Sequence, residues 1–168
     1  THALLGFLAQ RRGLAFISEA AAQVDLMTLA REAFIEESGG ALGRKYSGLD
    51  PLFTPAGYQA YVDDLLERMV NPHLRDAVDR VIRDPLRKLG WEDRLVGTLR
   101  LVRHFGGQPR RYALGAAAAR RQLARERGDG QPLPWSEVWG ADAAASPEGR
   151  EMAALIDRAD QELAERRL

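Results

Sequence analysis

The sequence predicts an all-α fold for the whole 168-residue chain. Apolar residues recur three and four positions apart along most of the chain, which is the spacing of one buried helix face. The apolar–polar alternation of a half-buried strand is nearly absent. Neither a G-x-G-x-x-G sequence nor a P-loop is present, so the chain lacks the glycine-rich turns of nucleotide-binding sheets. We expect one domain, residues 1–168, of about eight helices packed against antiparallel neighbours.

Two helices are expected in the N-terminal part of the chain. The apolar cluster Leu4–Leu8 marks the first helix, which should end near Gly13. A second apolar stripe runs over Leu26–Phe34. This helix should end at Gly39 and Gly40, because glycine is common just past the ends of helices.

A longer helix is expected after a loop over residues 45–53. Thr54 is suited to cap its N-terminus, and Pro55 is suited to the first helical position. The apolar residues that follow share one buried face and comprise Tyr58, Tyr61, Val62, Leu65, Leu66 and Met69. The Asn71-Pro72 pair should end this helix, because the residue before a proline disfavours the helical conformation.

Two shorter helices should follow. Residues 77–82 carry the apolar spacing of a short helix, which Pro85 closes. Residues 95–105 carry the spacing of another, which ends at the glycine pair 106–107.

Two long helices complete the predicted fold. A helix rich in alanine and arginine should begin at Pro109 and run to about Gly128, followed by a flexible connector. Ser146-Pro147 is the capping pair of a last helix. We interpret Trp135 and Trp139, which precede this helix, as hydrophobic anchors for it.

Composition narrows the class of function. The formal net charge of +0 disfavours a dedicated nucleic-acid binder, because such proteins usually carry a basic excess. With no cysteine and only three histidines, neither disulfides nor a metal site are expected. No apolar run approaches the about 20 residues that span a bilayer, and we expect no signal peptide before the first helix. We therefore expect a cytoplasmic protein that works without a metal ion.

The segment Asn71–Leu95 concentrates positive charge on one helix, a turn and the next helix. Its cationic residues are Arg80, Arg83, Arg87, Lys88 and Arg94. The planar donor fork of arginine and the compact charge of lysine both suit a phosphate group. The plainer interpretation is a solvated face paired with nearby carboxylates, namely Asp76, Asp79, Asp84, Glu92 and Asp93.

The order of residues in this segment resembles the mannitol dehydrogenase family, the polyol-specific long-chain dehydrogenases, in their C-terminal helical domain. The Asn71-Pro72 break, the Pro-Leu-Arg-Lys-Leu stretch 85–89 and the Asp-Arg-Leu stretch 93–95 carry the resemblance. These stretches are more similar to the mannitol-1-phosphate 5-dehydrogenases than to the free-sugar branch. The resemblance is strongest from about Tyr58 to Gly106, and it fades after about Ala119.

The resemblance implies which residues bind substrate. In the family, an arginine and a lysine with seven residues between them contact the oxygens of the sugar, and Arg80 and Lys88 have this spacing. We expect substrate-binding roles for both. Arg87 and Arg94 are candidates for contact with a phosphate group, and the alternative for each is a structural ion pair.

His2 is the candidate catalytic residue. By itself, a histidine near a chain end would be interpreted as an exposed terminal residue. The catalytic signature of the family is K-x-x-x-x-N-x-x-H, commonly followed by alanine, and His2-Ala3 likewise opens an apolar helix. The asparagine would then lie two residues before Thr1 and the lysine seven before it. We therefore expect natural sequence upstream of this chain.

The chemistry of that signature suits the oxidation of a polyol. A lysine with a lowered pKa can act as the base, and an asparagine amide can stabilise the developing oxyanion. A histidine one turn further along can orient a substrate hydroxyl. The resemblance implies that an upstream Rossmann domain binds NAD and that the active site lies between the two domains. This chain alone should therefore be inactive.

For the whole protein, the resemblance implies a monomeric, NAD-dependent enzyme that interconverts mannitol 1-phosphate and fructose 6-phosphate. A free-sugar relative, such as a mannitol 2-dehydrogenase or a hexuronate reductase, is one alternative. A non-enzymatic helical interaction module is another, with a basic face that contacts nucleic acid or an acidic partner. The arginines that suggest such a face are Arg110, Arg111, Arg120, Arg121, Arg125 and Arg127.

Overall fold

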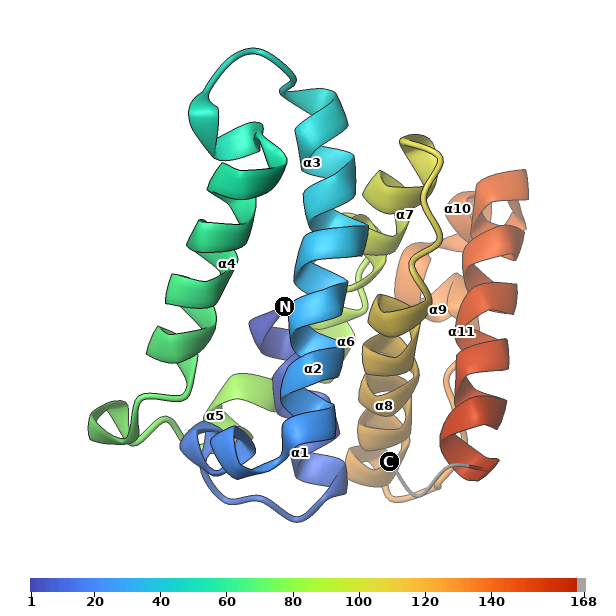
Figure 1. Ribbon diagram of the computed structural model, residues 1–168. Coiled ribbons are helices and arrows are strands. Elements are labelled where there is room, and N and C mark those ends of the chain that lie inside the picture. The colour runs from blue at the N-terminus through green and yellow to red at the C-terminus, as the bar shows by residue number, and fades with distance from the viewer. Residues whose placement is uncertain (166–168) are drawn as a thin grey trace.

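The computed structural model describes residues 1–165 and confirms the all-α class. These residues form eleven α-helices, from α1 (His2–Arg11) to α11 (Pro147–Glu165), and one isolated antiparallel bridge between Phe16 and Ala77. Figure 1 shows α4 at one edge, the α2–α3 helix beside it, then α8, with α11 at the other edge. No helix of the described part is long and apolar enough to cross a bilayer.

The other α-helices are α2 (Val24–Glu32), α3 (Gly40–Lys45), α4 (Pro55–Met69), α5 (Val78–Ile82), α6 (Pro85–Lys88), α7 (Val96–His104), α8 (Arg110–Arg127), α9 (Trp135–Trp139) and α10 (Ala141–Ala145). A π-helical segment, η2 (Ala33–Gly39), joins α2 to α3. Three 3-10 segments are η1 (Ile17–Ala22), η3 (Pro51–Phe53) and η4 (Pro72–Leu74). The four helices that the sequence pattern missed, α3, α6, α9 and α10, have only four to six residues. Such lengths are too short to show a helical period.

The capping signals in the sequence are confirmed. Thr54 Oγ1 accepts a hydrogen bond from the Gly57 amide at 3.2 Å at the start of α4. Ser146 Oγ accepts one from the Gly149 amide at 2.9 Å at the start of α11. Gly128 ends α8 with a φ of 80°, in the left-handed region that glycine adopts without strain.

The core forms where α8 packs between α1 and α11. Along its buried face, α8 carries small residues, so the neighbouring backbones approach closely. A Cβ atom at Gly115 would lie 2.7 Å from Cδ1 of Leu4. Residues 3–9 of α1 are all buried, so this helix is covered on every side. The packing therefore fixes the position of His2 at the first turn of α1.

The prediction that Gly39 and Gly40 end the second helix is wrong. Both residues have right-handed helical backbones, and α2, η2 and α3 form one continuous helix to Lys45. A Cβ atom on Gly39 would lie 2.7 Å from Cδ1 of the Tyr58 ring on α4. Glycine is therefore required at this position by the close approach of α4 and not by a turn.

The two neighbouring glycines are expected to respond in opposite ways to alanine. Gly39→Ala should lower the free energy of unfolding by about 1–3 kcal/mol, because the Tyr58 ring and α4 must shift. At Gly40 the new methyl group of Gly40→Ala would enter open space. This change should raise the free energy of unfolding by about 0.5–1 kcal/mol, because alanine favours the helix more than glycine does. Urea unfolding measures both values. Equal effects at the two positions would contradict the packing argument.

Candidate functional site

Asp76 brings two of the predicted site residues together at the junction of α1 and α5. Oδ1 of Asp76 accepts a hydrogen bond from Arg80 Nε at 2.8 Å and lies 2.6 Å from Nη2. His2 Nε2 lies 3.3 Å from Oδ2 of the same carboxylate, an electrostatic contact rather than an aligned hydrogen bond. Asp76 is only 8% exposed, so its charge acts in a partly desolvated setting. We call His2, Asp76 and Arg80 the His2 cluster.

The backbone around Asp76 is held by the isolated bridge. The Ile17 amide donates to the Asp76 carbonyl at 2.9 Å, and the Val78 amide donates to the Ala15 carbonyl at 2.9 Å. The segment after α1 therefore clamps the residues that precede α5. This clamp sets the carboxylate of Asp76 beside the first turn of α1.

The His2 imidazole is expected to be neutral near pH 7. Burial lowers its pKa from the usual 6.5, and the positive charge of Arg80 lowers it further, whereas the Asp76 carboxylate opposes the shift. The side chain is still 38% exposed. A neutral, accessible imidazole can donate or accept a hydrogen bond with a hydroxyl group, as the orienting role requires.

Lys88 is 6% exposed, and its ammonium donates a hydrogen bond to the Arg83 carbonyl just after α5. Asp84 directs this turn, because its carboxylate accepts from the Arg87 amide at 3.2 Å and caps α6. Asp84 adopts a φ of 60°, an uncommon conformation for a residue other than glycine. Lys88 thus lies against the same short helix that carries Arg80.

Two cations and two carboxylates lie around Lys88. Burial lowers the pKa of its ammonium, and the charges of Arg87 and Arg94 lower it further, while Asp84 and Asp93 oppose the shift. With Lys88 itself, three cations face two carboxylates, so one positive charge is in excess. An anionic ligand would relieve the repulsion between these three cationic groups.

Arg87 and Arg94 are both exposed and paired with neighbouring carboxylates. Arg87 Nε lies 3.2 Å from Asp84 Oδ2, and Arg94 Nη1 lies 3.0 Å from Asp93 Oδ1. Arg94 also lines an open depression of about 540 Å³ with Thr98 and other residues of the α7 start. Ion pairs this exposed are weak and rearrange at little cost. Their proposed contact with phosphate stays a prediction.

Trp139 holds the turn after Lys88 in place. Its indole Nε1 donates to the Leu89 carbonyl at 2.8 Å, and its ring stacks on Trp135 with centroids 4.1 Å apart. The two tryptophans therefore anchor α9 over the end of α6. The sequence had suggested anchors for the last helix, and that role stays a prediction. Asp76 and Trp139 are the positions that sequence reasoning did not assign to the site. Asp76 had one detectable signal, its place four residues before Arg80.

The described residues do not fit a dinucleotide cofactor. NAD binds where a glycine-rich turn joins a parallel strand to a helix, and residues 1–165 contain helices and a single isolated bridge. Within the same residues, His, Asp and Glu side chains form no group of three that could hold a metal ion.

A comparison with protein families decides the assignment. The profile of the family described as the mannitol dehydrogenase C-terminal domain matches residues 1–165. The chain belongs to this family. The all-α fold agrees with membership, and the resemblance carried by Asn71-Pro72 and residues 85–95 is confirmed.

Similar full-length proteins carry the name mannitol-1-phosphate 5-dehydrogenase. The chain is 36% identical to the protein of Halalkalibacterium halodurans, 35% to that of Anoxybacillus flavithermus and 36% to that of Bacillus licheniformis. Each match extends over 118 residues, which is 70% of this chain and 30% of the relative. This member of the mannitol dehydrogenase C-terminal domain family thus spans a minor part of those enzymes.

Proposed function

We propose that the chain is the substrate-binding domain of an NAD-dependent dehydrogenase that interconverts mannitol 1-phosphate and fructose 6-phosphate. The observation that carries the proposal is the His2 cluster, with Arg80 on the short helix whose end binds Lys88, in a chain about 36% identical to proteins named mannitol-1-phosphate 5-dehydrogenase. The NAD site, the catalytic lysine and the asparagine would come from sequence upstream of Thr1. The whole enzyme would act in the cytoplasm as a monomer.

The residues of the proposed site would hold the sugar through unused donors. Arg80 carries five N–H donors and spends some on Asp76, and its side chain is 67% exposed. Lys88 has three donors and spends one on the Arg83 carbonyl. The remaining donors would bind sugar oxygens. His2 would orient the hydroxyl that loses its proton, while Asp76 keeps the imidazole and Arg80 in register.

The phosphate group would lie beside Lys88, Arg87 and Arg94. A phosphate ester carries about −1.5 to −2 charges at neutral pH, which would offset the mutual repulsion of these cations. Arginine suits this role because its guanidinium can give two parallel hydrogen bonds to phosphate oxygens. The weak pairs of Arg87 with Asp84 and of Arg94 with Asp93 would rearrange on binding.

The protein encoded by the full-length gene tests the proposal. It should oxidise NADH with fructose 6-phosphate and give no comparable rate with fructose, because the free sugar lacks the group that Arg87 and Arg94 would bind. Turnover of fructose but not of its phosphate would favour the free-sugar alternative. NAD-linked turnover by the isolated 168-residue chain would contradict the proposal.

The same assay tests the phosphate contact with a matched pair of variants. Arg94→Ala should raise KM for fructose 6-phosphate about 10- to 150-fold, the equivalent of one charge-assisted hydrogen bond. Arg68 on α4 is a matched control, because it is similarly exposed and also paired with an aspartate, Asp64. Arg68→Ala should leave KM unchanged. An unchanged KM in Arg94→Ala would remove Arg94 from the site.

The interaction-module alternative receives little support from the arginines of α8. Four of its six cationic side chains are engaged in ion pairs: Arg111, Arg120, Arg121 and Arg127. These ion pairs place carboxylates within the basic face that would bind nucleic acid. A salt-sensitive band shift with generic DNA would nevertheless favour that alternative.

A further inference from the structure

Tyr112 of α8 carries a buried hydroxyl group close to the start of α1. The residue is 1% exposed, and burial raises the pKa of its phenol. The Tyr112 hydroxyl lies 2.6 Å from Oγ1 of Thr1 and 3.0 Å from Oγ of Ser38. These three hydroxyl groups come from α8, from the residue before α1 and from η2. We call Thr1, Ser38 and Tyr112 the Tyr112 network.

The direction of the hydrogen bonds in the Tyr112 network follows from the donors. A hydroxyl group has one proton to donate and two lone pairs to accept. Ser38 Oγ donates its proton to the Phe34 carbonyl at 3.2 Å, so it accepts from Tyr112. Tyr112 has then used its own proton and accepts from Thr1. The chain of donors therefore runs from Thr1 through Tyr112 and Ser38 to the backbone of η2.

The segment η2 holds Tyr112 at two points. Oε2 of Glu37 accepts from the Tyr112 amide at 3.1 Å, and the next residue, Ser38, bonds to the phenol hydroxyl. Glu37 and Ser38 are both buried. Consecutive side chains of one π-helical segment therefore fix the backbone and the tip of the same tyrosine.

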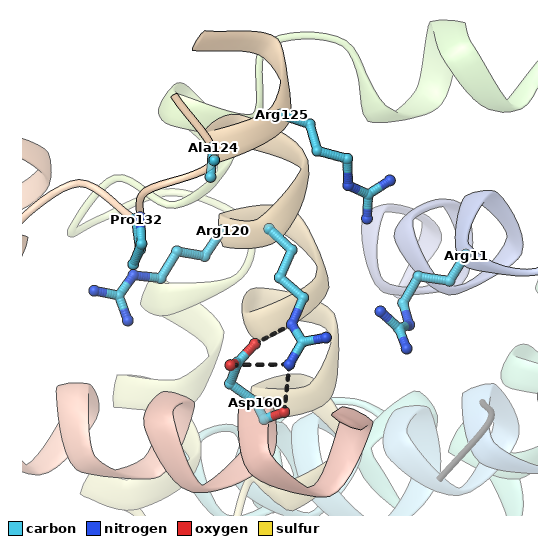
Figure 2. Close-up of a pocket in the computed structure, with 8 residues that line it drawn as sticks. Arg11, Arg120, Ala124, Arg125, Pro132 and Asp160 are labelled. Carbon is cyan, nitrogen blue, oxygen red and sulfur yellow. Dashed lines mark hydrogen bonds and ion pairs between the residues drawn. The ribbon is translucent and has the colours of Figure 1, made fainter. Parts of the chain in front are cut away.

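The helix that carries Tyr112 is itself held on two sides. Toward α1, a Cβ atom on Gly115 would lie 3.1 Å from Cα of Leu4, so the two backbones are in close contact. Toward α11, Arg121 bonds to both carboxylate oxygens of Asp160 and donates to the Asp160 carbonyl at 2.8 Å. Dashed lines at Asp160 in Figure 2 mark these bonds. The phenol hydroxyl of Tyr112 is therefore a fixed point against which the start of α1 can be placed.

Thr1 transmits this placement to His2. Thr1 is the N-cap residue of α1, and its carbonyl accepts from the Leu5 amide at 2.9 Å. A threonine in this position commonly caps its own helix with its hydroxyl group, but Thr1 makes no such bond. The hydroxyl binds Tyr112 instead. Because one planar peptide unit joins Thr1 to His2, holding Thr1 also holds the backbone from which the imidazole extends.

We propose that Tyr112 is a positioning residue of the dehydrogenase, which sets the backbone of His2 through Thr1 while Asp76 holds the imidazole. This inference rests on the proposed function, in which His2 orients the hydroxyl that loses its proton. A second anchor matters because the contact of His2 with Asp76 is not an aligned hydrogen bond. Tyr112 is buried, so it acts through Thr1 and not by contact with substrate.

Replacement of Tyr112 by phenylalanine in the full-length enzyme tests the proposal, because it removes only the hydroxyl group. Tyr112→Phe should lower kcat for fructose 6-phosphate about tenfold and change KM by less than about twofold, since it misplaces the orienting group and leaves the substrate-binding cations in place. An unchanged kcat would overturn the positioning role.

Tyr58→Phe is the matched control for the loss of a buried phenol hydroxyl. Tyr58 is 6% exposed, and its pKa is raised to about 12 by burial, although a hydrogen bond with Ser38 opposes the shift. Tyr58 thus shares Ser38 with Tyr112, but the residue that bonds to Thr1 is Tyr112. Tyr58→Phe should lower stability toward urea and leave kcat unchanged. An equal loss of kcat in Tyr58→Phe and Tyr112→Phe would mean a general effect of core damage and overturn the proposal.

Variants of Thr1 test the same hydrogen bond without a substitution in the core. Thr1→Val keeps the branched shape and removes the hydroxyl group, so kcat should fall as in Tyr112→Phe. Thr1→Ser keeps a hydroxyl group and should recover most of the kcat that Thr1→Val loses. In the double variant of Thr1→Val and Tyr112→Phe the two losses should not add, because both remove one shared bond. Additive losses would overturn the proposed link.

The NMR signals of the His2 imidazole test the link without any turnover. They are measured in the full-length protein with isotope-labelled histidine and assigned with His2→Asn. Tyr112→Phe and Thr1→Val should shift the His2 ring signals, whereas Tyr58→Phe should not. Identical His2 signals in all of these proteins would overturn the positioning role, even in an active enzyme. Shifted signals in a protein that does not turn over fructose 6-phosphate would instead contradict the proposed function and support the link from Tyr112 to His2.

Discussion

In the full-length enzyme, replacement of Lys88 by methionine is expected to lower kcat/KM for fructose 6-phosphate about 100-fold or more. Methionine keeps the apolar stem in its buried position and removes the ammonium, which is 6% exposed and donates to the Arg83 carbonyl. Each charge-assisted hydrogen bond lost to the sugar costs about 10- to 150-fold. Steady-state kinetics of NADH oxidation measures the change.

A second measurement separates substrate binding from a purely structural role. The Lys88 ammonium also links α6 to the end of α5, so Lys88→Met should lower the free energy of unfolding as well. Lys45→Met is the matched control, because Lys45 is exposed at the end of α3 and lies only over the Tyr46 ring. It should change neither kcat/KM nor stability appreciably. A destabilised Lys88→Met enzyme with the kcat/KM of the wild type would show that Lys88 only clamps the two helices.

The helix ends could be predicted because local chemistry determines them. Thr54 and Ser146 cap α4 and α11 through their own side chains, and Gly128 ends α8 in the left-handed conformation. These interactions join residues at most a few positions apart, so the sequence alone contains them. Gly39 shows the limit of this reasoning. Its role depends on Tyr58, which lies on another helix, and no local pattern distinguishes a glycine of close packing from one of a turn.

The site could be predicted only in part for the same reason. Arg80 and Lys88 were found by their spacing in a family motif, and the structure places Arg80 on α5 and Lys88 against the carbonyl of Arg83 at the end of that helix. The spacing says nothing of Asp76 as a shared partner of His2 and Arg80, because that contact depends on how α1 packs against α5. The structure gives the positions of these side chains.

The helix α1 links two charged regions through an apolar middle. Residues 3–9 are buried, so substitutions there would disturb both ends, whereas His2 and Arg11 lie at opposite ends and meet different elements. His2 meets Asp76, and Arg11 meets Leu163 near the end of α11. Mutational effects at His2 and at Arg11 should therefore be additive, as for sites more than about 10 Å apart.

Replacement of Glu37 by alanine is expected to lower the free energy of unfolding by about 3–5 kcal/mol, the cost of removing one partner of a buried charge pair. Glu37 is 3% exposed and caps the start of α8 from another helix. Its carboxylate accepts from the Arg111 amide at 2.8 Å and from the Tyr112 amide at 3.1 Å. Pro109, the residue just before α8, has no side-chain hydrogen bond that caps this helix.

Glu36→Ala is the control, because Glu36 is 58% exposed although it lies 2.9 Å from Arg111. It should cost about 0–1 kcal/mol, as exposed pairs do.

The pH dependence of the unfolding free energy distinguishes the effect of the Glu37 charge from the effect of its hydrogen bonds. Burial is the largest effect and raises the pKa of Glu37 above the usual 4.5, although the two amides and Arg111 oppose the shift. The folded state then holds the proton more tightly than the unfolded state. The contribution of this group to stability is therefore largest below pH 4.5 and is lost as pH rises through the folded pKa. Glu37→Gln keeps one acceptor oxygen and cannot titrate. The free energy of unfolding of Glu37→Gln, relative to that of the wild type, should therefore increase as pH rises through the folded pKa of Glu37. Urea unfolding at several pH values measures this difference. If the difference in unfolding free energy between the variant and the wild type stays constant with pH, the carboxylate does not titrate with a raised pKa. Its hydrogen bonds to the start of α8 would then outweigh the cost of burying its charge.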